Sequence, residues 1–251
     1  MAVLWEKSCN DSTYKVTQAG NAIRLYRNQV LHSQWNPKAP ISGKIWDIFL
    51  LSSVGQQLQI QNALVLGAGG GSVINLIHYF YPEAIVDAVD LDKNQLYAAK
   101  KFFKVSDSNT HLINQNVIDW AKKKNKKKYD LIVDDVFFET NNSPFRSVDV
   151  KKQWASELLK RLTTHGNLVI NFADLSEWKR DRKYIEKIAL QKKYNIGVGI
   201  QNSCENRIVF LSKNCLAAKI LKRQLVYAKT KPFLTYWKNG MFTYKQVMRS
   251  K

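Results

Sequence analysis

Apolar and polar residues alternate one by one along much of the first 35 residues. Gly and Asn interrupt the alternation at short intervals, which is typical of half-buried strands joined by tight turns. The pattern predicts three strands, at residues 14–17, 22–26 and 29–35. A linker with two prolines follows at 36–40, so the chain is expected to begin with a small β-meander.

Beyond residue 43 the spacing changes to helices that alternate with short apolar runs. Helical spacing appears first at 44–54 and 72–80 and recurs further along the chain. Seven apolar runs are expected to be strands, at 63–66, 85–89, 111–113, 129–133, 167–172, 194–200 and 207–211. Strands that alternate with helices build a parallel sheet, whereas the last two are joined by a short turn and must be antiparallel. The pattern predicts an α/β fold with a mostly parallel seven-stranded sheet and an antiparallel final strand.

The densest cluster of glycines follows the first of these strands. Residues 67–71 read Gly-Ala-Gly-Gly-Gly, and Ser72 opens the next helix. Glycines let the backbone approach a ligand closely, and the first N–H groups of a helix are unpaired there. Asp90 ends the next strand about twenty residues later, where a carboxylate can accept hydrogen bonds from a ribose. A nucleoside-containing cofactor is therefore expected, with a helix cap as the alternative role of Asp90.

The spacing of the glycines separates two classes of cofactor. The dinucleotide fingerprint requires its third glycine at position 72, where this chain has serine. The closing antiparallel pair, and a single βα series without a second mononucleotide half, also argue against a dinucleotide fold.

The motifs resemble those of the class I S-adenosylmethionine-dependent methyltransferase fold. More narrowly, they are similar to its spermidine synthase branch, the polyamine aminopropyltransferases and their methyltransferase-like relatives. The resemblance covers most of the chain and rests on motifs at 20–21, 67–72, 89–92, 113–120, 129–135 and 165–171. It implies a Rossmann-like domain at 43–213, after an N-terminal β-meander and linker at 1–42 and before a basic, aromatic-rich tail at 214–251.

The resemblance also implies where the cofactor would lie, as S-adenosylmethionine, its decarboxylated form or methylthioadenosine. Asp90 would hold the two ribose hydroxyls, with Leu91 against the adenine face. The amino-acid end and the ribose would rest on the residues of the glycine turn, which are Gly67, Ala68, Gly69, Gly70 and Gly71.

Three further positions match family motifs. Asn116 stands where the family usually has an aspartate that reads the adenine amino group, and its amide oxygen can accept the same hydrogen bond. Val117 would lie beside the ring. Asp134 matches the carboxylate at the transfer centre. It is the predicted catalytic residue and, like Asp90 and Asn116, a predicted cofactor contact. Asn116 and Asp134 could instead be cap or turn residues.

The residues that bind the amine in spermidine synthases are missing. The motif Asp-x-x-Asp-Pro reads 134–138 here, with Phe137 in place of the second acid. The family's Tyr-His-Glu corresponds to 42–46, which contains none of the three, and the acid of the glycine turn is Gly70. The first hypothesis is therefore a methyltransferase. A polyamine aminopropyltransferase with an altered amine pocket is the second, and a non-catalytic nucleoside- or polyanion-binding protein is the third.

The charge of the chain bears on its partners. There are 39 Lys and Arg against 20 Asp and Glu, a net charge of +19, and 213–251 contains ten cations and no acid. Such a field attracts nucleic acid or an anionic membrane surface and repels polyamines. The same residues could simply form a solvated surface, as expected for the lysine run 122–128. The tail aromatics could stack on bases or pack on the domain: Tyr227, Phe233, Tyr236, Trp237, Phe242 and Tyr244.

Several classes of protein are excluded or disfavoured. Three cysteines and four histidines lack the spacing of a disulfide framework or a metal site, so no metal is expected. No run approaches the roughly 18 apolar residues of a membrane span, and no signal peptide is apparent, which favours the cytoplasm. No motif identifies the acceptor, and a homodimer is one assembly that we consider.

Replacement of the ribose-binding carboxylate tests the cofactor hypothesis. Asp90→Ala is expected to weaken the bound nucleoside about tenfold or more, because it removes charge-assisted hydrogen bonds. Calorimetric titration measures the dissociation constant. An unchanged constant would contradict the ribose role.

Overall fold

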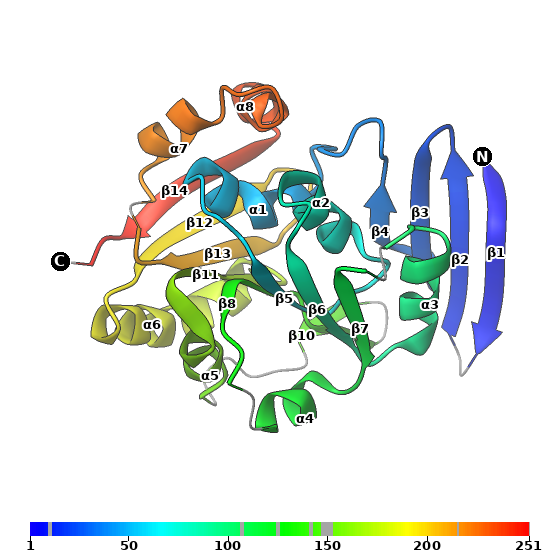
Figure 1. Cartoon of the computed structure of the whole chain (residues 1–251), viewed down its shortest axis with the longest axis horizontal. Coiled ribbons are helices and arrows are strands. Elements are labelled where there is room, and N and C mark those ends of the chain that lie inside the picture. Colours follow the sequence, from blue (N-terminus) through cyan, green and yellow to red (C-terminus); the bar gives the residue numbers. More distant parts are fainter. Residues whose placement is uncertain are drawn as a thin grey trace.

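A computed structural model describes residues 1–9, 12–105, 108–123, 126–140, 143–146, 153–214 and 216–250. Figure 1 shows a small antiparallel sheet at the N-terminus beside a larger sheet with helices on both faces. A hairpin formed by β9 (Phe137–Thr140) and β10 (Ser143–Arg146) follows the central strands. The α/β fold and the separate N-terminal β element predicted from the sequence are confirmed.

The N-terminal sheet has four strands rather than the three that were predicted. In order they are β1 (Ala2–Cys9), β2 (Ser12–Ala19), β3 (Ala22–Arg27) and β4 (Val30–Trp35), each antiparallel to the next. The additional strand β1 is exposed along most of its length, so its sequence lacks the alternation that marks a half-buried strand. The inner strands alternate because Tyr14, Val16 and Leu25 are buried.

The main sheet has eight strands, in the order β14-β12-β13-β11-β8-β5-β6-β7. Their bounds are β5 Asn62–Leu66, β6 Ile85–Asp90, β7 Thr110–Asn114, β8 Tyr129–Asp134, β11 Leu162–Phe172, β12 Asn195–Gln201, β13 Arg207–Ser212 and β14 Phe242–Met248. The five strands from β11 to β7 are parallel, whereas β13 is antiparallel to β11 and β12, and β14 to β12. The parallel series and the antiparallel pair agree with the prediction.

The eighth strand comes from the segment that was predicted as a basic tail. Phe242 and Tyr244 are buried against the sheet, together with Phe233 and Trp237 of the helix before it. The described part of 214–251 therefore packs on the domain, which is the second of the two roles considered for its aromatics. Packing rather than base stacking explains most of these side chains. The domain boundaries at 42 and 213 stay predictions.

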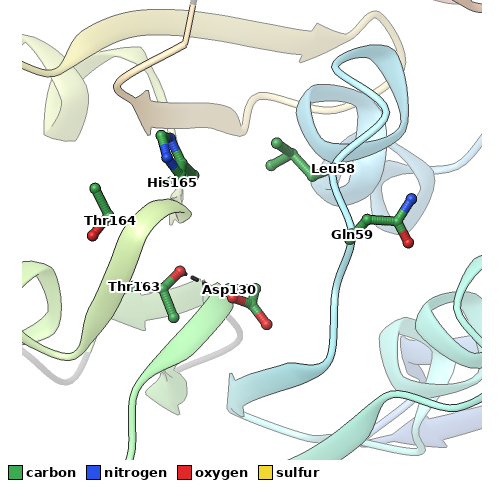
Figure 2. A pocket seen from close by; sticks show the side chains of 6 residues that line it. All are labelled: Leu58, Gln59, Asp130, Thr163, Thr164 and His165. Carbon is green, nitrogen blue, oxygen red and sulfur yellow. Dashed lines mark hydrogen bonds between the residues drawn. The ribbon is translucent and has the colours of Figure 1, made fainter.

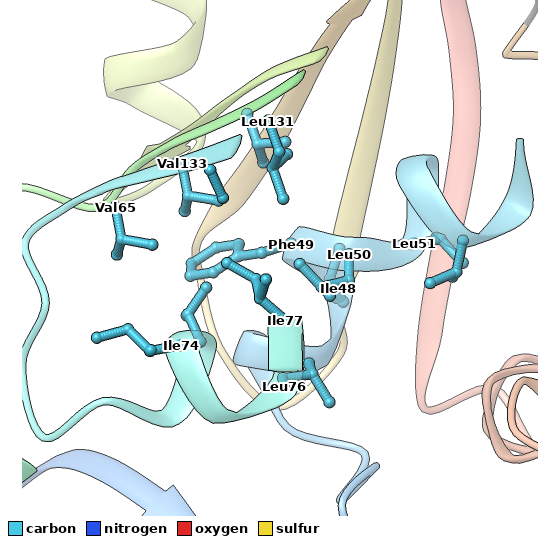
Figure 3. Close-up of a cluster of buried hydrophobic side chains, with 14 of the residues drawn as sticks. Ile48, Phe49, Leu50, Leu51, Val65, Ile74, Leu76, Ile77, Leu131 and Val133 are labelled. Atoms are coloured by element: carbon cyan, nitrogen blue, oxygen red, sulfur yellow. The ribbon is translucent and has the colours of Figure 1, made fainter. Parts of the chain in front are cut away.

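Eight helices in the described part of the chain cover the main sheet on both faces. One apolar cluster lies under α1 (Ile45–Gly55), α2 (Ser72–Phe80), α3 (Lys93–Lys101), α7 (Ala218–Gln224) and α8 (Lys231–Lys238). The other lies under α4 (Val117–Lys122), α5 (Ala155–Lys160) and α6 (Leu175–Gln191). Figure 3 shows how Phe49 of α1 and Ile77 of α2 meet Val65 and Val133 of the central strands. These apolar layers hold the strand ends in place, and the strand ends carry the site.

A buried acid lies in the first turn of α1. The Asp47 side chain is almost fully buried, and one carboxylate oxygen accepts the N–H groups of Ser42 and Gly43 at 2.8 and 2.5 Å. Burial raises the pKa of Asp47 to about 7, although these hydrogen bonds oppose the rise. The charged form is therefore costly in the folded protein at neutral pH.

Asp47→Asn tests this cost. An acid whose pKa is raised by folding contributes most to stability below its unfolded pKa, and this contribution is lost as pH rises toward the folded pKa. Relative to the variant, the wild type is expected to lose on the order of 4 kcal/mol between pH 4 and pH 7, with little change above. The amide that replaces the carboxylate can still accept both N–H groups through its carbonyl oxygen. Denaturant unfolding at several pH values measures the difference, and a constant difference would contradict the burial effect.

Candidate active site

The site lies where the strand order of the main sheet reverses. The chain passes from β5 outward to β6 and β7, then returns to the other side of β5 as β8. In open α/β sheets, ligands bind in the crevice outside the carboxyl ends of the strands at such a reversal, which here lies between β5 and β8. The glycine turn follows β5, and Asp135 follows β8. Sequence motifs that are far apart are thus brought together at the position where open α/β sheets bind ligands.

The glycine turn passes very close to the backbone after β8. Gly67 has a φ of 82°, and a Cβ on it would lie 2.1 Å from the carbonyl oxygen of Asp135. The N–H of Gly67 donates to Val89, and the N–H of Asp135 donates to Leu66, at 2.9 and 2.8 Å. No other residue fits at position 67 without displacing the start of the loop after β8. The glycine at 67 therefore has a structural reason within the protein, and the close approach of the turn to a ligand stays a prediction.

The N-terminal sheet is fastened to the other side of the same turn. Ser33 of β4 accepts the N–H of Gly70 at 2.7 Å, and a Cβ on Gly70 would lie 2.8 Å from that of Ser33. The hydroxyl of Ser72 donates to the carbonyl of Gln34 and accepts its N–H, at 2.9 and 2.8 Å. An acid at position 70 would have to displace Ser33. Close packing against Ser33 therefore explains why position 70 is a glycine and not the acid found in spermidine synthases.

Asp90 faces the glycine turn from the end of β6. One carboxylate oxygen accepts the N–H of Gly69 at 2.9 Å, and the other accepts the N–H of Asp92 at 2.8 Å. Burial raises the pKa of Asp90 above its usual value, and the nearby Asp92 charge contributes. Asp92, not Asp90, caps α3, because its side chain accepts the N–H groups of Asn94 and Gln95. Leu91 is half exposed.

The predicted adenine contacts lie at the start of α4. Asn116 is the N-cap of this helix, and its side-chain oxygen accepts the N–H of Ile118 at 2.8 Å. Val117 is buried in the apolar cluster under α4. The capping role considered for Asn116 is thus present in the structure, and its contact with adenine stays a prediction.

Asp134 and Asp135 have different surroundings. Side chains of consecutive strand residues point to opposite faces, and Asp134 lies on the face of α5, fully buried. It forms an ion pair with Arg146 and accepts the indole N–H of Trp154 at 2.8 Å. The guanidinium also donates to the carbonyl of Asn171 at 2.8 Å. These contacts favour a structural role for Asp134, and its catalytic role stays a prediction.

Asp135 was not predicted as a site residue. Its carboxylate accepts the side-chain N–H of Asn171 at 2.7 Å, and Asn171 in turn accepts that of Asn206 at 3.0 Å. Burial raises the pKa of Asp135 to about 6, and the charges of Asp134 and Asp90 contribute to the rise. The strand period was the signal that separates the two acids, because it places Asp134 at the end of β8 on the face that α5 covers.

A hollow with a volume of about 430 Å³ lies at the opposite edge of the sheet. Figure 2 shows its lining residues between the loop before β5 and the starts of β8 and β11. Its lining residues are Leu58, Gln59, Asp130, Thr163, Thr164 and His165. Asp130 accepts the hydroxyl of Thr163 at 2.9 Å and the backbone N–H groups of 61 and 62 at 2.9 and 3.0 Å. This carboxylate ties loops together and is remote from the glycine turn.

Two further features concern metals and membranes. In the part of the chain that the structure describes, no group of three or more His, Cys, Asp or Glu side chains is placed to hold a metal ion. Among the same residues, no helix is long and apolar enough to cross a membrane.

Comparison with known proteins identifies the family. The family model for the methyltransferase small domain matches residues 47–192, which is more than half of the chain and includes the glycine turn, Asp90 and Asp135. The chain belongs to the methyltransferase small domain family. The relation to class I methyltransferases expected from the motifs is thereby confirmed. A search of curated proteins finds no match.

Solved structures from both expected branches share the fold. A "probable spermidine synthase" from Corynebacterium glutamicum ATCC 13032 matches with a TM-score of 0.71 and 14% identity, over 100% of this chain and 96% of that one. A spermidine synthase in complex with the transition state analogue AdoDATO matches with a TM-score of 0.59 and 12% identity, over 89% of this chain and 77% of that one. Human methyltransferase-like protein 13 in complex with SAH matches with a TM-score of 0.56 and 20% identity, over 79% of this chain and 91% of that one. At these identities the likeness is one of fold.

Removal of the buried ion pair tests the role of Asp134. Asp134→Ala leaves Arg146 buried without its partner, so the free energy of unfolding is expected to fall by about 3–5 kcal/mol. The double variant Asp134→Leu, Arg146→Met is expected to recover part of this loss, because no charge remains buried. Urea unfolding measures both. A stable Asp134→Ala protein that loses only cofactor binding would instead support the predicted contact between Asp134 and the cofactor.

Proposed function

We propose that this chain is an S-adenosylmethionine-dependent methyltransferase. The observation that carries the proposal is the meeting of the glycine turn, Asp90 and Asp135 in the crevice between β5 and β8. Membership in the methyltransferase small domain family and neighbours such as the SAH complex support it.

The residues in the crevice suit the cofactor. The glycines let the turn pack tightly against the loop after β8 and against β4, and the carboxylate of Asp90 lies beside the turn. The turn 67–71, Asp90, Leu91, Asn116 and Val117 would hold the nucleoside and its amino-acid end. When bound, S-adenosylmethionine supplies a methyl group on a positively charged sulfur. Positioning contributes most of the rate of such an in-line displacement, so few catalytic side chains are needed.

Asp135 is the candidate general base. A pKa of about 6 leaves it ionised at neutral pH and still basic enough to take a proton from an acceptor. Asn171 holds the carboxylate, and the backbone of Asp135 is fixed against Gly67. Its negative charge also favours a cationic sulfur in the same crevice.

The amine side of the site argues against aminopropyl transfer. Ser33 occupies the space beside position 70, and Asp47 is buried and bonded to its own loop. Phe137 stands where the family has an acid that binds the amine. A polyamine carries several positive charges, so a chain with a net charge of +19 repels it. These features favour a methyl acceptor over a polyamine.

Calorimetric titration with three ligands distinguishes the hypotheses. S-adenosylmethionine is expected to bind more tightly than its decarboxylated form or methylthioadenosine. Preference for the decarboxylated form would favour the aminopropyltransferase. No binding of any of the three would favour a non-catalytic protein.

The pH dependence of binding tests Asp135 without knowledge of the acceptor. S-adenosylmethionine carries a sulfonium charge that S-adenosylhomocysteine lacks, and the two share every other ionisable group. Ionisation of Asp135 above pH about 6 is therefore expected to raise the affinity for S-adenosylmethionine about fivefold relative to that for S-adenosylhomocysteine. Asp135→Asn is expected to remove this pH dependence. The assignment of Asp135 would be contradicted if the ratio of the two dissociation constants did not change with pH. It would also be contradicted if Asp134→Asn, and not Asp135→Asn, removed the pH dependence of this ratio.

A further inference from the structure

The lysine run 122–128 is largely occupied by contacts within the protein. Four of its lysines donate to nearby groups: Lys122 to Asp119, Lys123 to Gln115, Lys127 to Asp87, and Lys128 to the carbonyl of Lys160. Asp87 also accepts the hydroxyl of Tyr129 and is paired with His111. Residues 124 and 125 lie outside the described part of the chain. The run that is most basic in the sequence is therefore a poor candidate for a binding surface.

The cations of the C-terminal segment have a different environment. This segment contains no acid, and no carboxylate of the described residues forms an ion pair with its lysines and arginines. Lys222 of α7 is exposed, and its ammonium lies 4.6 Å from the ring centroid of Trp237 in α8. Lys238 is the last residue of α8 and is also exposed.

The end of α8 leads to the carboxyl edge of the main sheet. Met241 accepts the N–H of Asn202, just after β12, at 2.9 Å. Its side chain also packs against Gly43, where a Cβ would lie 2.6 Å from the Met241 methyl. Lys44 is the next residue and is exposed. The cations of α7 and α8 are thus continued by Lys44 at the start of α1.

A fourth cation brings this series to the candidate base. Gln201, the last residue of β12, donates to the carbonyl of Gly43, next to Lys44, at 3.2 Å. Arg207 opens the neighbouring strand β13, and one of its guanidinium nitrogens donates to the carbonyls of Glu205 and Asn206. Asn206, next to Arg207, donates to Asn171, which holds Asp135. We define the cationic track as Lys222, Lys238, Lys44 and Arg207. It runs from α7 to the residues that hold Asp135.

We propose that the cationic track binds the phosphodiester backbone of a nucleic acid and leads the chain to Asp135, so that the methyl acceptor is RNA or DNA. The inference rests on the proposed methyltransferase function. Repeated positive positions on α7, α8, α1 and β13 match a polymer with repeated negative charges. Because Phe233 and Trp237 beside the track are buried, phosphate contacts rather than base stacking would supply most of the affinity.

Fluorescence anisotropy with a labelled mixed-sequence RNA tests the track. The track variant carries Lys44→Gln, Lys222→Gln and Lys238→Gln. The control variant carries Lys179→Gln, Lys183→Gln and Lys187→Gln, which remove three exposed charges from α6. With a single strand, loss of three phosphate contacts is expected to lower the salt slope by about 2 and the affinity at 0.1 M salt by about 100-fold. The control variant is expected to lose much less affinity for the RNA.

Several results would overturn the inference. They are equal losses in the two variants, wild-type binding without salt dependence, and binding to vesicles of anionic phosphatidylglycerol in preference to RNA. A DNA strand of the same sequence distinguishes the two nucleic acids. Titration of the wild type with S-adenosylhomocysteine is a separate measurement. If this ligand does not bind, the methyltransferase proposal fails, whatever the RNA result.

Discussion

The contact between the glycine turn and the loop after β8 is the constraint on which the site depends. Gly67 and the carbonyl of Asp135 lie so close that any side chain at position 67 would force the two loops apart. The N–H of Asp135 is bonded to Leu66, so the backbone of one strand end positions the next. Asp90 reaches the same turn through Gly69. Three strand ends are thereby held at one place by main-chain hydrogen bonds and by the carboxylate of Asp90.

This arrangement assigns different tasks to carboxylates that are close in sequence. Asp134 neutralises Arg146 inside the protein, Asp135 is bonded to Asn171, and Asp92 caps α3 while Asp90 faces the turn. In each pair, one acid stabilises the scaffold and the other is the one proposed to meet the ligand. The site thus presents negative charge locally in a protein whose net charge is strongly positive.

Much of the fold could be predicted from local patterns, and the exceptions have physical reasons. The parallel series and the glycine turn carry strong periodic signals. Strand β1 gives no such signal because both of its faces are largely exposed. In β14, Phe242 and Tyr244 alternate with polar residues as a strand should, but neighbouring lysines suggested a stacking surface. Asp134 could not be separated from Asp135 by motif alone, because its partners Arg146 and Trp154 are brought to it only by the fold.

The hydroxyl of Ser72 connects the N-terminal sheet to the main sheet's first helix after the glycine turn. By bonding to both main-chain groups of Gln34, it takes the place of a neighbouring strand and joins β4 to the first turn of α2. The first 35 residues therefore cover the glycine turn and are not a detachable appendage. Their removal would take away Leu25 and Ser33, which pack against Gly70, and would leave this side of the turn uncovered.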